Sequence, residues 1–238
     1  MIPSISVIRG FFHKYRSLTG LGVAALFAEL AYAILNLSAL PMYVKFTLNQ
    51  GEHYGFILAT FLLTEAASRP AFGALGDKIG RRPLMIAGPA VTAVTAYLTI
   101  YFHNPLYLVL LRAVDGLGSG ALWPSAFATI GDIVEEENRS AAMSMLNVTY
   151  MSGLALAFLL GGAVNEHFHS YAASFYLVSI LLVAAVVVMV LFLPRKIGAH
   201  HHAASETPRV EHLEIPTLEE PTPFKLGNLL RSFREVPD

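Results

Sequence analysis

Residues 73–85 read GALGDKIGRRPLM, a short polar stretch between two long apolar runs. Its three glycines permit a tight turn, because glycine adopts backbone angles that other residues avoid. Asp77 has a charge opposite to that of Lys78, Arg81 and Arg82, so the stretch can form ion pairs within itself. We therefore expect two antiparallel helices joined by a compact, charged turn.

The composition around this turn is typical of a membrane protein. Of the 238 residues, 55% are hydrophobic and 14% are charged, whereas a soluble domain carries about 25% charge. Residues 17–193 contain only 17 of the 33 charged side chains. This distribution disfavours a soluble enzyme and a disordered chain, and the net charge of −1 gives no reason to expect a nucleic-acid partner. The chain has no cysteine, which excludes thiolate catalysis and Cys-ligated metals.

Six apolar segments are long enough to cross the hydrocarbon layer, which takes about 20 helical residues. Their continuous apolar character favours helices over a barrel, whose strands alternate. We predict an all-α membrane protein with a cytoplasmic N-terminus over 1–16, a six-helix transmembrane domain over 17–193 and a cytoplasmic linker over 194–238. The predicted spans are 18–44, 54–73, 84–102, 106–131, 140–164 and 171–193.

The linker contains two features. His200, His201 and His202 form a run that fits a solvated linker better than a metal site, because no second ligand group lies near it. Residues 224–233 are amphipathic, which fits an interfacial helix and an ordinary linker helix equally. We predict no metal and no cofactor.

Basic residues predict the orientation, because they concentrate on the cytoplasmic side. Nine lie on one side of the predicted spans and only Lys45 lies on the other. Both termini are therefore predicted to be cytoplasmic, in a multi-pass protein of the plasma or inner membrane. The nine are Arg9, Lys14, Arg16, Lys78, Arg81, Arg82, Arg139, Arg195 and Lys196.

Charged side chains inside the predicted spans indicate function, because each costs several kcal/mol at membrane depth. The third and sixth spans have none, so we expect these two helices at the periphery and the other four around a polar interior. Since each group of three ends with an uncharged helix, a 3+3 inverted repeat is predicted. The charged residues are Glu29, Glu65, Arg69, Arg112 and Asp115.

Helical spacing places Glu29, Tyr32 and Asn36 on one face of the first helix. Glu29 has no basic partner on its own helix. A carboxyl group that gains and loses a proton as the cavity opens to each side is what proton coupling requires. We therefore predict that this face contacts substrate and protons.

Two further pairs are candidates for the same role. Glu65 and Arg69 are four residues apart, and Arg112 and Asp115 are three apart, so each pair can form within one helix. Either pair could contact substrate or protons, or could be a neutral brace between helices.

Small residues at short spacing predict close helix contacts. The segment 116–120 lacks the Lys-Ser/Thr of a phosphate loop, so packing is its predicted role. The glycines assigned to packing are Gly116, Gly118, Gly120, Gly153, Gly161 and Gly162.

The stretch 73–85 resembles the signature of the major facilitator superfamily, with Gly76 in place of the usual alanine. The resemblance implies half of a major-facilitator bundle, whose members have two six-helix halves. It also implies a network of Asp77, Arg81 and Asp132 that stabilises the outward-open state, with Gly73, Lys78, Gly80 and Arg82 completing the motif. A topological signal made of positive charge is the alternative.

Two further segments resemble motifs of this family. Residues 112–118 fit Arg-x-x-x-Gly-x-Gly, in which the arginine is implicated in proton coupling, with Asp115 as a departure. Residues 153–162 keep both ends of the motif of drug and proton antiporters but lose its central Gly-Pro. The antiporter subclass is therefore suggested.

The sequence thus predicts the N-terminal half of a secondary transporter and not an enzyme. We expect proton-coupled efflux of a small molecule by alternating access, with the lipid bilayer and a second six-helix half as partners. The alternatives are a sugar or organic-anion symporter or uniporter, and a truncated fragment or subunit that does not transport.

Overall fold

The computed structural model describes residues 16–194, which contain helices and no strand. The all-α prediction is confirmed for this part of the chain. The chain divides into two units, residues 1–202 and 203–238, and all described residues belong to the first. The predicted N-terminal segment before residue 16, the linker after residue 194 and its amphipathic stretch 224–233 lie outside the described residues.

The helices follow the apolar runs and extend beyond most of them. A first helical stretch runs without interruption from Arg16 to Thr47 and includes two π-helical segments. The elements are α2 (Arg16–Ile34), η1 (Leu35–Ala39), α3 (Leu40–Met42), η2 (Tyr43–Thr47), η3 (Gly51–His53), α4 (Tyr54–Ile79), α5 (Arg81–Thr99), α6 (Pro105–Ile133), α7 (Glu136–His167) and α8 (Ala173–Phe192).

Four helical stretches of the described residues are long and apolar enough to cross a bilayer: Arg16–Thr47, Pro105–Ile133, Glu136–His167 and Ala173–Phe192. Helices α4 and α5 are not among them, because polar and charged side chains lower their mean hydropathy. The count of six membrane crossings therefore stays a prediction.

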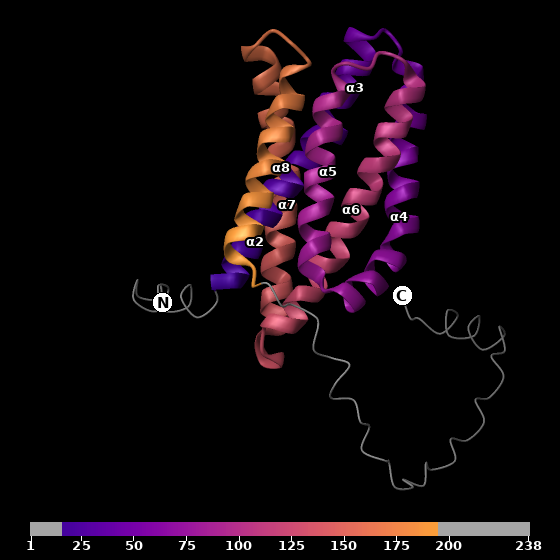
Figure 1. The fold of residues 1–238 in the computed structure, drawn as a ribbon. Helices are drawn as coiled ribbons and strands as arrows, with labels where there is room; N and C mark the ends of the chain where they lie inside the picture. The colour runs from indigo at the N-terminus through magenta and orange to yellow at the C-terminus, as the bar shows by residue number, and fades with distance from the viewer. Residues whose placement is uncertain (1–15, 195–238) are drawn as a thin grey trace, which may run out of the picture. The chain divides into compact units, whose positions relative to one another are not determined.

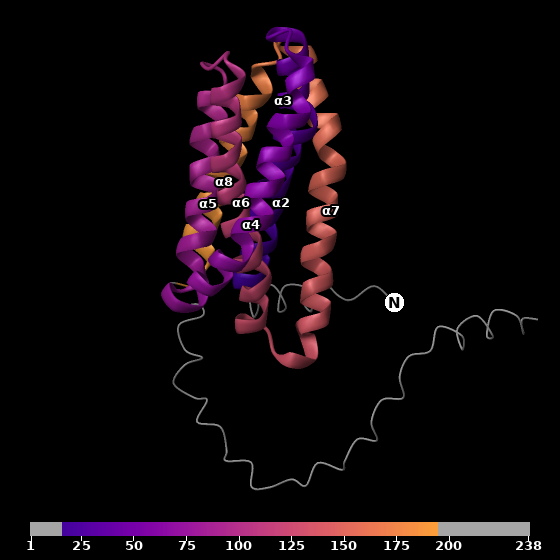
Figure 2. The same ribbon diagram turned by 90° about the vertical axis from the view of Figure 1, so that its right-hand side faces the viewer.

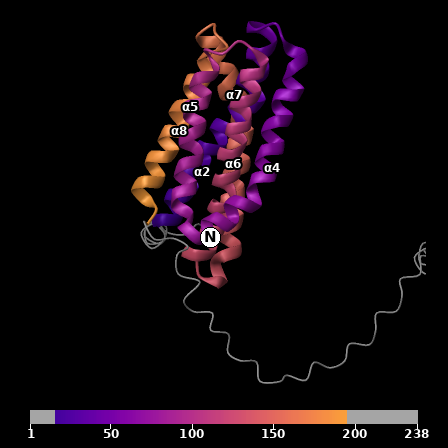
Figure 3. The same cartoon turned by 45° about the vertical axis from the view of Figure 1, so that its right-hand side comes forward.

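The helices pack in two groups, and the most extensive contact between the groups is that of α5 with α8. Helix α6 packs along α4 and α5, and α2 packs along α7 and α8. Helices α5 and α8 join the groups. Figures 1 and 2 show the helices side by side along their lengths, and Figure 3 shows α6 between α5 and α4.

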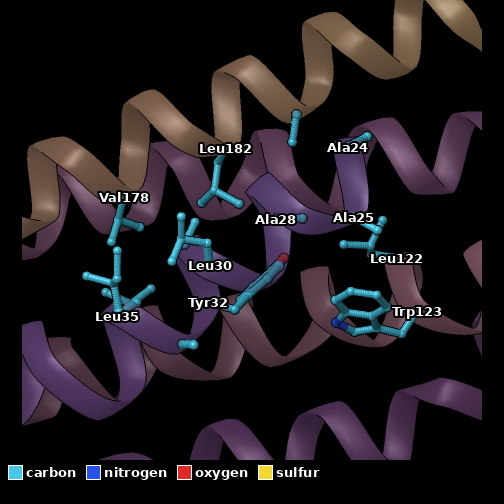
Figure 4. Packing of buried hydrophobic residues seen from close by; sticks show 14 of the residues in the cluster. Ala24, Ala25, Ala28, Leu30, Tyr32, Leu35, Leu122, Trp123, Val178 and Leu182 are labelled. Carbon is cyan, nitrogen blue, oxygen red and sulfur yellow. The ribbon is translucent and has the colours of Figure 1, made fainter. Parts of the chain in front are cut away.

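Part of the apolar core lies where the first helical stretch meets α8. Leu35 of the first helical stretch and Val178 and Leu182 of α8 are completely buried. Figure 4 shows these side chains together with Leu122 and Trp123 of α6, which belong to the same buried apolar cluster. Burying a leucine or valine side chain contributes roughly 1.5–3 kcal/mol in water. In lipid the corresponding gain comes from close packing.

The polar stretch 73–85 is helical on both sides of one residue. Helix α4 continues to Ile79 and α5 begins at Arg81, so the predicted multi-residue turn reduces to Gly80. Charged residues mark where an apolar run ends, but they do not end a helix. Gly80 has φ 89° and ψ 153°, a conformation that residues with a Cβ rarely adopt.

Helix α5 differs from the uncharged, peripheral helix predicted over 84–102. It buries Thr92, Thr95 and Thr99. The Thr95 hydroxyl lies 3.1 Å from the carbonyl oxygen of Thr92 on its own helix, and Thr99 donates to the carbonyl of Thr95. Because threonine satisfies its hydroxyl in this way, a helix can carry a polar face without a charged residue.

The basic residues near the helix ends are distributed unequally between the two ends of the bundle. The start of α2, the α4–α5 and α6–α7 turns and the end of α8 lie at one end of the bundle, and the other connections lie at the opposite end (Figure 1). Arg16, Arg81, Arg82 and Arg139 therefore lie near the first end, and Lys45 lies near the other.

The hinge at Gly80 gives a testable prediction. Gly80→Ala should lower stability by about 1–2 kcal/mol, because a Cβ is strained at positive φ. Gly73→Ala is the matched control: a Cβ there would meet nothing within 4 Å, and alanine favours a helix interior. Thermal unfolding in detergent should show a loss for Gly80→Ala alone. Equal losses for the two variants would contradict the hinge.

Candidate functional site

A cavity of about 270 Å³ lies between α2, α4, α6 and α7. It combines carboxyl, amide and hydroxyl groups with aromatic and aliphatic side chains. A second cavity of about 250 Å³ shares Trp123 and Tyr150 with the first and adds Arg69 and Asn147. Residues lining the first include Glu29, Tyr32, Asn36, Phe61, Glu65, Ser119, Trp123, Tyr150 and Leu154.

Glu29 is the carboxyl group of this cavity that lacks a basic partner. Its side chain is buried, and no ion pair joins it to a basic residue within the described part of the chain. Tyr150 on α7 lines the same cavity, and Tyr150 and Glu65 are both near enough to Glu29 to interact with its carboxyl group electrostatically. Two acidic groups therefore face one cavity, and only one of them has a basic partner.

Glu65 is held from two sides. Its carboxyl oxygen Oε1 accepts hydrogen bonds from Arg69 Nη2 at 2.8 Å and from Ser119 Oγ at 2.7 Å. Arg69 remains half exposed and lines the second cavity. The pair is thus formed within α4, as its spacing allows, and also connects α4 to α6.

Trp123 forms the aromatic wall common to both cavities. Its ring is buried and packs edge-on against Tyr150, with ring centroids 4.9 Å apart and an interplanar angle of 79°. Figure 4 shows Trp123 and Tyr32 in the same interior layer. An apolar or aromatic ligand in either cavity would contact this wall.

Arg112 and Asp115 form an ion pair with no exposed surface. Asp115 also accepts a hydrogen bond from the hydroxyl of Thr95 on α5. Nitrogen Nη1 of Arg112 has no hydrogen-bond partner among the described residues. Removing one member of a buried pair leaves an uncompensated charge, which is strongly unfavourable.

Helix α5 contacts both this pair and a residue of the first cavity. The hydroxyls of Tyr32 and Thr92 are hydrogen-bonded at 3.1 Å. Tyr32 lines the cavity, and Thr92 lies one turn before Thr95, which donates to Asp115. Three helices, α2, α5 and α6, thus contribute to one buried polar cluster.

The backbone around Asn36 explains a further contact. In the π segment, the N–H of Leu40 donates to the carbonyl of Leu35, so the next bond of this pattern would run from residue 41 to Asn36. Residue 41 is Pro41, which has no N–H. The hydroxyl of Tyr54 donates to the Asn36 carbonyl instead, at 2.7 Å.

The charged residues at the first end of the bundle form a second cluster. Arg81 contacts Asp77 at 3.2 Å and Asp132 at 3.0 Å. The Asp77 side chain is 59% exposed and that of Asp132 is 13% exposed, so the inner contact is the better shielded one. Arg82 donates to the carbonyl of Val190 on α8 at 2.7 Å. Lys78 is exposed.

The glycines of α6 lie where neighbouring helices approach most closely. A Cβ on Gly116 would collide with Thr64 and with the backbone of Phe61, and one on Gly120 would collide with Ser68. On the opposite side, a Cβ on Gly118 would lie 2.8 Å from the carbonyl oxygen of Gly88. These positions leave room for hydrogen only.

The glycines of α7 divide into two kinds. A Cβ on Gly153 would lie 3.0 Å from the backbone nitrogen of Leu30, and one on Gly161 would lie 2.7 Å from Cβ of Ser38. A Cβ on Gly162 would meet no described atom within 4 Å. The predicted packing role of Gly162 therefore has no partner within the described residues.

Several site residues escaped the sequence analysis. Tyr150 shares the cavity with Glu29, Thr92 is hydrogen-bonded to Tyr32, Thr95 donates to Asp115, and Gly88 faces Gly118. Tyrosine, threonine and glycine are common in membrane helices, and none costs enough at membrane depth to stand out. For Thr92 and Thr95, the three-residue spacing on an otherwise apolar helix was the available signal.

Comparison with known proteins places this arrangement in a family. The profile of the Major Facilitator Superfamily matches residues 21–237. The chain therefore belongs to the Major Facilitator Superfamily, a family of membrane transporters and not of enzymes. The resemblance of the stretch 73–85 is thereby confirmed.

Curated relatives include transport and resistance proteins. The inner membrane transport protein YajR of Escherichia coli is 29% identical over 173 residues, which are 73% of this chain and 37% of YajR. The multidrug efflux pump LfrA of Mycolicibacterium smegmatis is 35% identical over 128 residues, 53% of this chain and 25% of LfrA. The quinolone resistance protein NorA of Staphylococcus aureus is 26% identical over 164 residues, 68% of this chain and 42% of NorA. The chain thus spans less than half the length of these relatives.

Solved structures share the fold. A bacterial homologue of the human drug peptide transporters PepT1 and PepT2 superposes with a TM-score of 0.66 at 18% identity, over 75% of this chain and 42% of that one. The human organic anion transporter MFSD10 superposes with a TM-score of 0.59 at 18% identity, over 76% of this chain and 48% of that one. In both, the matched region is less than half of the other chain.

The contact between Tyr54 and Asn36 gives a second prediction. Tyr54→Phe should destabilise the chain by about 1–3 kcal/mol, because a backbone carbonyl would lose its hydrogen bond. Tyr107→Phe is the control, since the Tyr107 side chain is half exposed and has no hydroxyl hydrogen bond among the described contacts. Thermal unfolding in detergent measures both. No difference between the variants would mean that the carbonyl does not need Tyr54.

Proposed function

We propose that this chain is the N-terminal six-helix half of a secondary transporter that moves a small molecule out of the cell in exchange for protons. The observation that carries the proposal is the cavity between α2, α4, α6 and α7, where Glu29 and Glu65 face an aromatic wall. An unpaired carboxyl group can bind a proton or attract a cationic group. A protonated carboxyl group is neutral and attracts a cation only weakly, so the proton and the cation compete. Competition of this kind is the physical basis of exchange.

Efflux is favoured by the relatives and by the lining of the cavity. Two of the relatives are named as a multidrug efflux pump and a quinolone resistance protein. The wall formed by Trp123 and Tyr150, with Phe61 and Leu154, suits an apolar or aromatic molecule. The carboxyl groups add a preference for positive charge.

We further propose six membrane crossings arranged as a 3+3 inverted repeat. The contacts between helices support this arrangement. Exchanging α2, α4 and α5 for α6, α7 and α8 converts the α4–α6 contact into α7–α2, and the α5–α6 contact into α8–α2. The α5–α8 contact is converted into itself. The same extensive contacts thus recur in both groups of three, as a repeat requires.

Alternating access then needs two components. A second six-helix half would close the open side of the cavity, and rocking of the halves would expose it to each side of the membrane in turn. The basic end of the bundle is the proposed cytoplasmic end. There, the cluster of Asp77, Arg81 and Asp132 would stabilise one of the two arrangements.

Transport in lipid vesicles tests the proposal. The complete assembly should move aromatic cations against their gradient when a pH gradient is imposed, and the movement should stop when the pH gradient is collapsed. Sugars and organic anions should not be moved. Movement of a sugar or organic anion would favour a symporter or uniporter, and no flux of any kind would favour a non-transporting subunit.

Glu29 gives the third prediction. Glu29→Gln should abolish proton-coupled flux and leave membrane insertion intact, because an amide fits the site without carrying a titratable proton. Glu52→Gln is the control, since Glu52 is exposed at the opposite end of the bundle from the charged cluster. Flux driven by a pH gradient is the measurement. Unchanged coupling in Glu29→Gln would remove Glu29 from the mechanism.

The charged cluster gives the fourth prediction. Asp132→Asn should slow turnover more than Asp77→Asn, because its contact to Arg81 is the better shielded one. An exposed ion pair contributes about 0.2–1 kcal/mol, so Asp77→Asn should slow flux by no more than about fivefold. Substrate preference should not change in either variant. A changed preference with unchanged turnover would contradict the conformational role.

A further inference from the structure

The second cavity has no role in the proposed exchange at Glu29. It lies against α4, α6 and α7 and shares two lining residues with the first cavity. Its lining includes one cation, Arg69, and one amide, Asn147, and no acidic residue of the described part of the chain. The first cavity has the opposite character, because Glu29 and Glu65 are its only charged lining residues among those described. Two neighbouring cavities thus carry opposite charges.

We propose that the second cavity binds an anionic group of the substrate, with Arg69 and Asn147 as its ligands, while a cationic group of the same molecule lies beside Glu29. The substrate class is then an aromatic zwitterion, whose two charges are separated by an apolar ring system. This inference rests on the proposed function, because it specifies the molecule that occupies the site assigned there to an aromatic cation.

The volumes of the cavities favour one molecule that occupies both. They are about 270 Å³ and 250 Å³, whereas sites for drug-sized ligands measure about 300–1,000 Å³. Each cavity alone is therefore smaller than such a site, and the two together are large enough. Since Trp123 and Tyr150 line both cavities, a ring system on these side chains extends from one cavity into the other.

The guanidinium of Arg69 has donors left for a ligand. Within the described residues it donates to Glu65 through Nη2 alone, although a guanidinium has five N–H donors. The Arg69 side chain is 52% exposed, whereas that of Glu65 is 11% exposed. The carboxylate is thus the inner member of the pair and the guanidinium is the outer one. An anion in the second cavity can therefore bind the remaining nitrogens without displacing Glu65.

The exposure of Arg69 argues against a purely structural role for this pair. The other pair of this kind, Arg112 with Asp115, has no exposed surface, so a substrate does not reach its guanidinium. An exposed guanidinium adds little to a brace between helices, because water and salt screen its charge. Glu65 also accepts a hydrogen bond from Ser119 of α6 at 2.7 Å, so the link between α4 and α6 does not depend on Arg69.

The wall between the two charges selects a ring system. Trp123 packs against Tyr150 on one side and against Phe127 on another, with 6.3 Å between the Trp123 and Phe127 ring centroids. Phe127 lines the second cavity, so the aromatic surface continues from the shared wall into that cavity. An aliphatic zwitterion would cover this surface poorly, whereas aromatic rings pack on it favourably.

The arrangement of charges also excludes a simple anion. A carboxylate without an ammonium group would gain contacts with Arg69 but would be repelled by Glu29 and Glu65. An ammonium without a carboxylate would gain the contact with Glu29 and leave Arg69 to water. A molecule with both groups gains both contacts, so it should bind most tightly.

Calorimetric titration of the full chain in lipid nanodiscs tests this subsite with three probes that share one ring system. The zwitterion is 4′-(aminomethyl)biphenyl-4-carboxylic acid, the cation is its methyl ester, and the anion is 4′-methylbiphenyl-4-carboxylic acid. The zwitterion should bind about tenfold more tightly than the ester, because hydrogen bonds between charged groups are stronger than those to a neutral ester. The anion should bind more weakly than the ester.

Variants identify the ligands of the anionic group. Arg69→Gln should remove the preference for the zwitterion and change the affinity for the ester by less than about threefold. The double variant Glu65→Gln/Arg69→Gln should do the same, and it leaves no uncompensated carboxylate in the site. Asn147→Asp places a carboxylate beside the anionic group and should reverse the preference. Arg139→Gln is the control, since Arg139 lines neither cavity, and it should keep the tenfold preference.

The ratio of the zwitterion and ester affinities separates binding from folding, because a variant that only loosens the bundle weakens both probes together. The proposal is overturned if wild-type chain binds the two probes equally or binds neither of them. It is also overturned if Arg69→Gln and the double variant both keep the preference, if Asn147→Asp does not reverse it, or if Arg139→Gln loses it.

The outcome is separable from that of the proposed function. If the complete assembly exchanges aromatic cations for protons and the zwitterion has no advantage in binding, the anionic subsite alone fails. If the zwitterion binds through Arg69 and the assembly shows no proton-coupled flux, the exchange mechanism fails and the subsite stands.

Discussion

The close approach of α6 to its two neighbours determines most of the structure. Gly116 and Gly120 let α4 approach from one side, and Gly118 meets Gly88 of α5 on the other. In lipid the hydrophobic effect does not drive helices together, because the surrounding lipid tails are also apolar. Contacts between helices therefore depend on van der Waals packing and on hydrogen bonds. The approach also brings Ser119 within hydrogen-bonding distance of Glu65.

The polar sites follow from this packing. If α6 packed at normal distance from α5, Asp115 would be separated from Thr95, and its charge would lack the hydrogen bond that accompanies the ion pair. Likewise, Glu65 would keep only the contact with Arg69, its neighbour on the same helix. Glycine positions on one helix thus determine which acidic groups gain a hydrogen bond from a neighbouring helix. Glu29, which shares its cavity with Tyr150 of α7, has no ion pair to a basic residue within residues 16–194.

The sequence was sufficient to predict the helices, because length and apolar character directly reflect the thickness of a bilayer. It was also sufficient to place Glu29, Tyr32 and Asn36 on one face, since helical spacing is fixed. The turn between α4 and α5 was predicted to span several residues, but the structure has only Gly80 there. The prediction was too long because it assumed that charged residues end a helix. A helix can continue well beyond the apolar layer once water is available to its charged side chains.

The partners of the charged groups could not be predicted. Thr95 and Tyr150 come from helices that no pairing rule assigns to Asp115 or Glu29, and their residue types are unremarkable in apolar segments. Charged residues stand out in the sequence because they are expensive to bury, whereas the hydroxyl groups around them do not. The hydroxyl groups that stabilise the buried charges could not be recognised in this way, since a hydroxyl costs little to bury and can be satisfied within its own helix.

One consequence concerns α6 as a mechanical element. Asp132 lies 14 residues beyond Gly118, or about 21 Å along the axis at 1.5 Å per residue. A tilt of about 5° around the tight glycine contact would therefore displace Asp132 by roughly 2 Å. The contact between Asp132 and Arg81 is 3.0 Å long, so this displacement is enough to separate the two groups. In the proposed rocking motion, α6 would act as a lever whose pivot lies beside the buried ion pair, and a slight rotation at the pivot would open a charge contact at its far end.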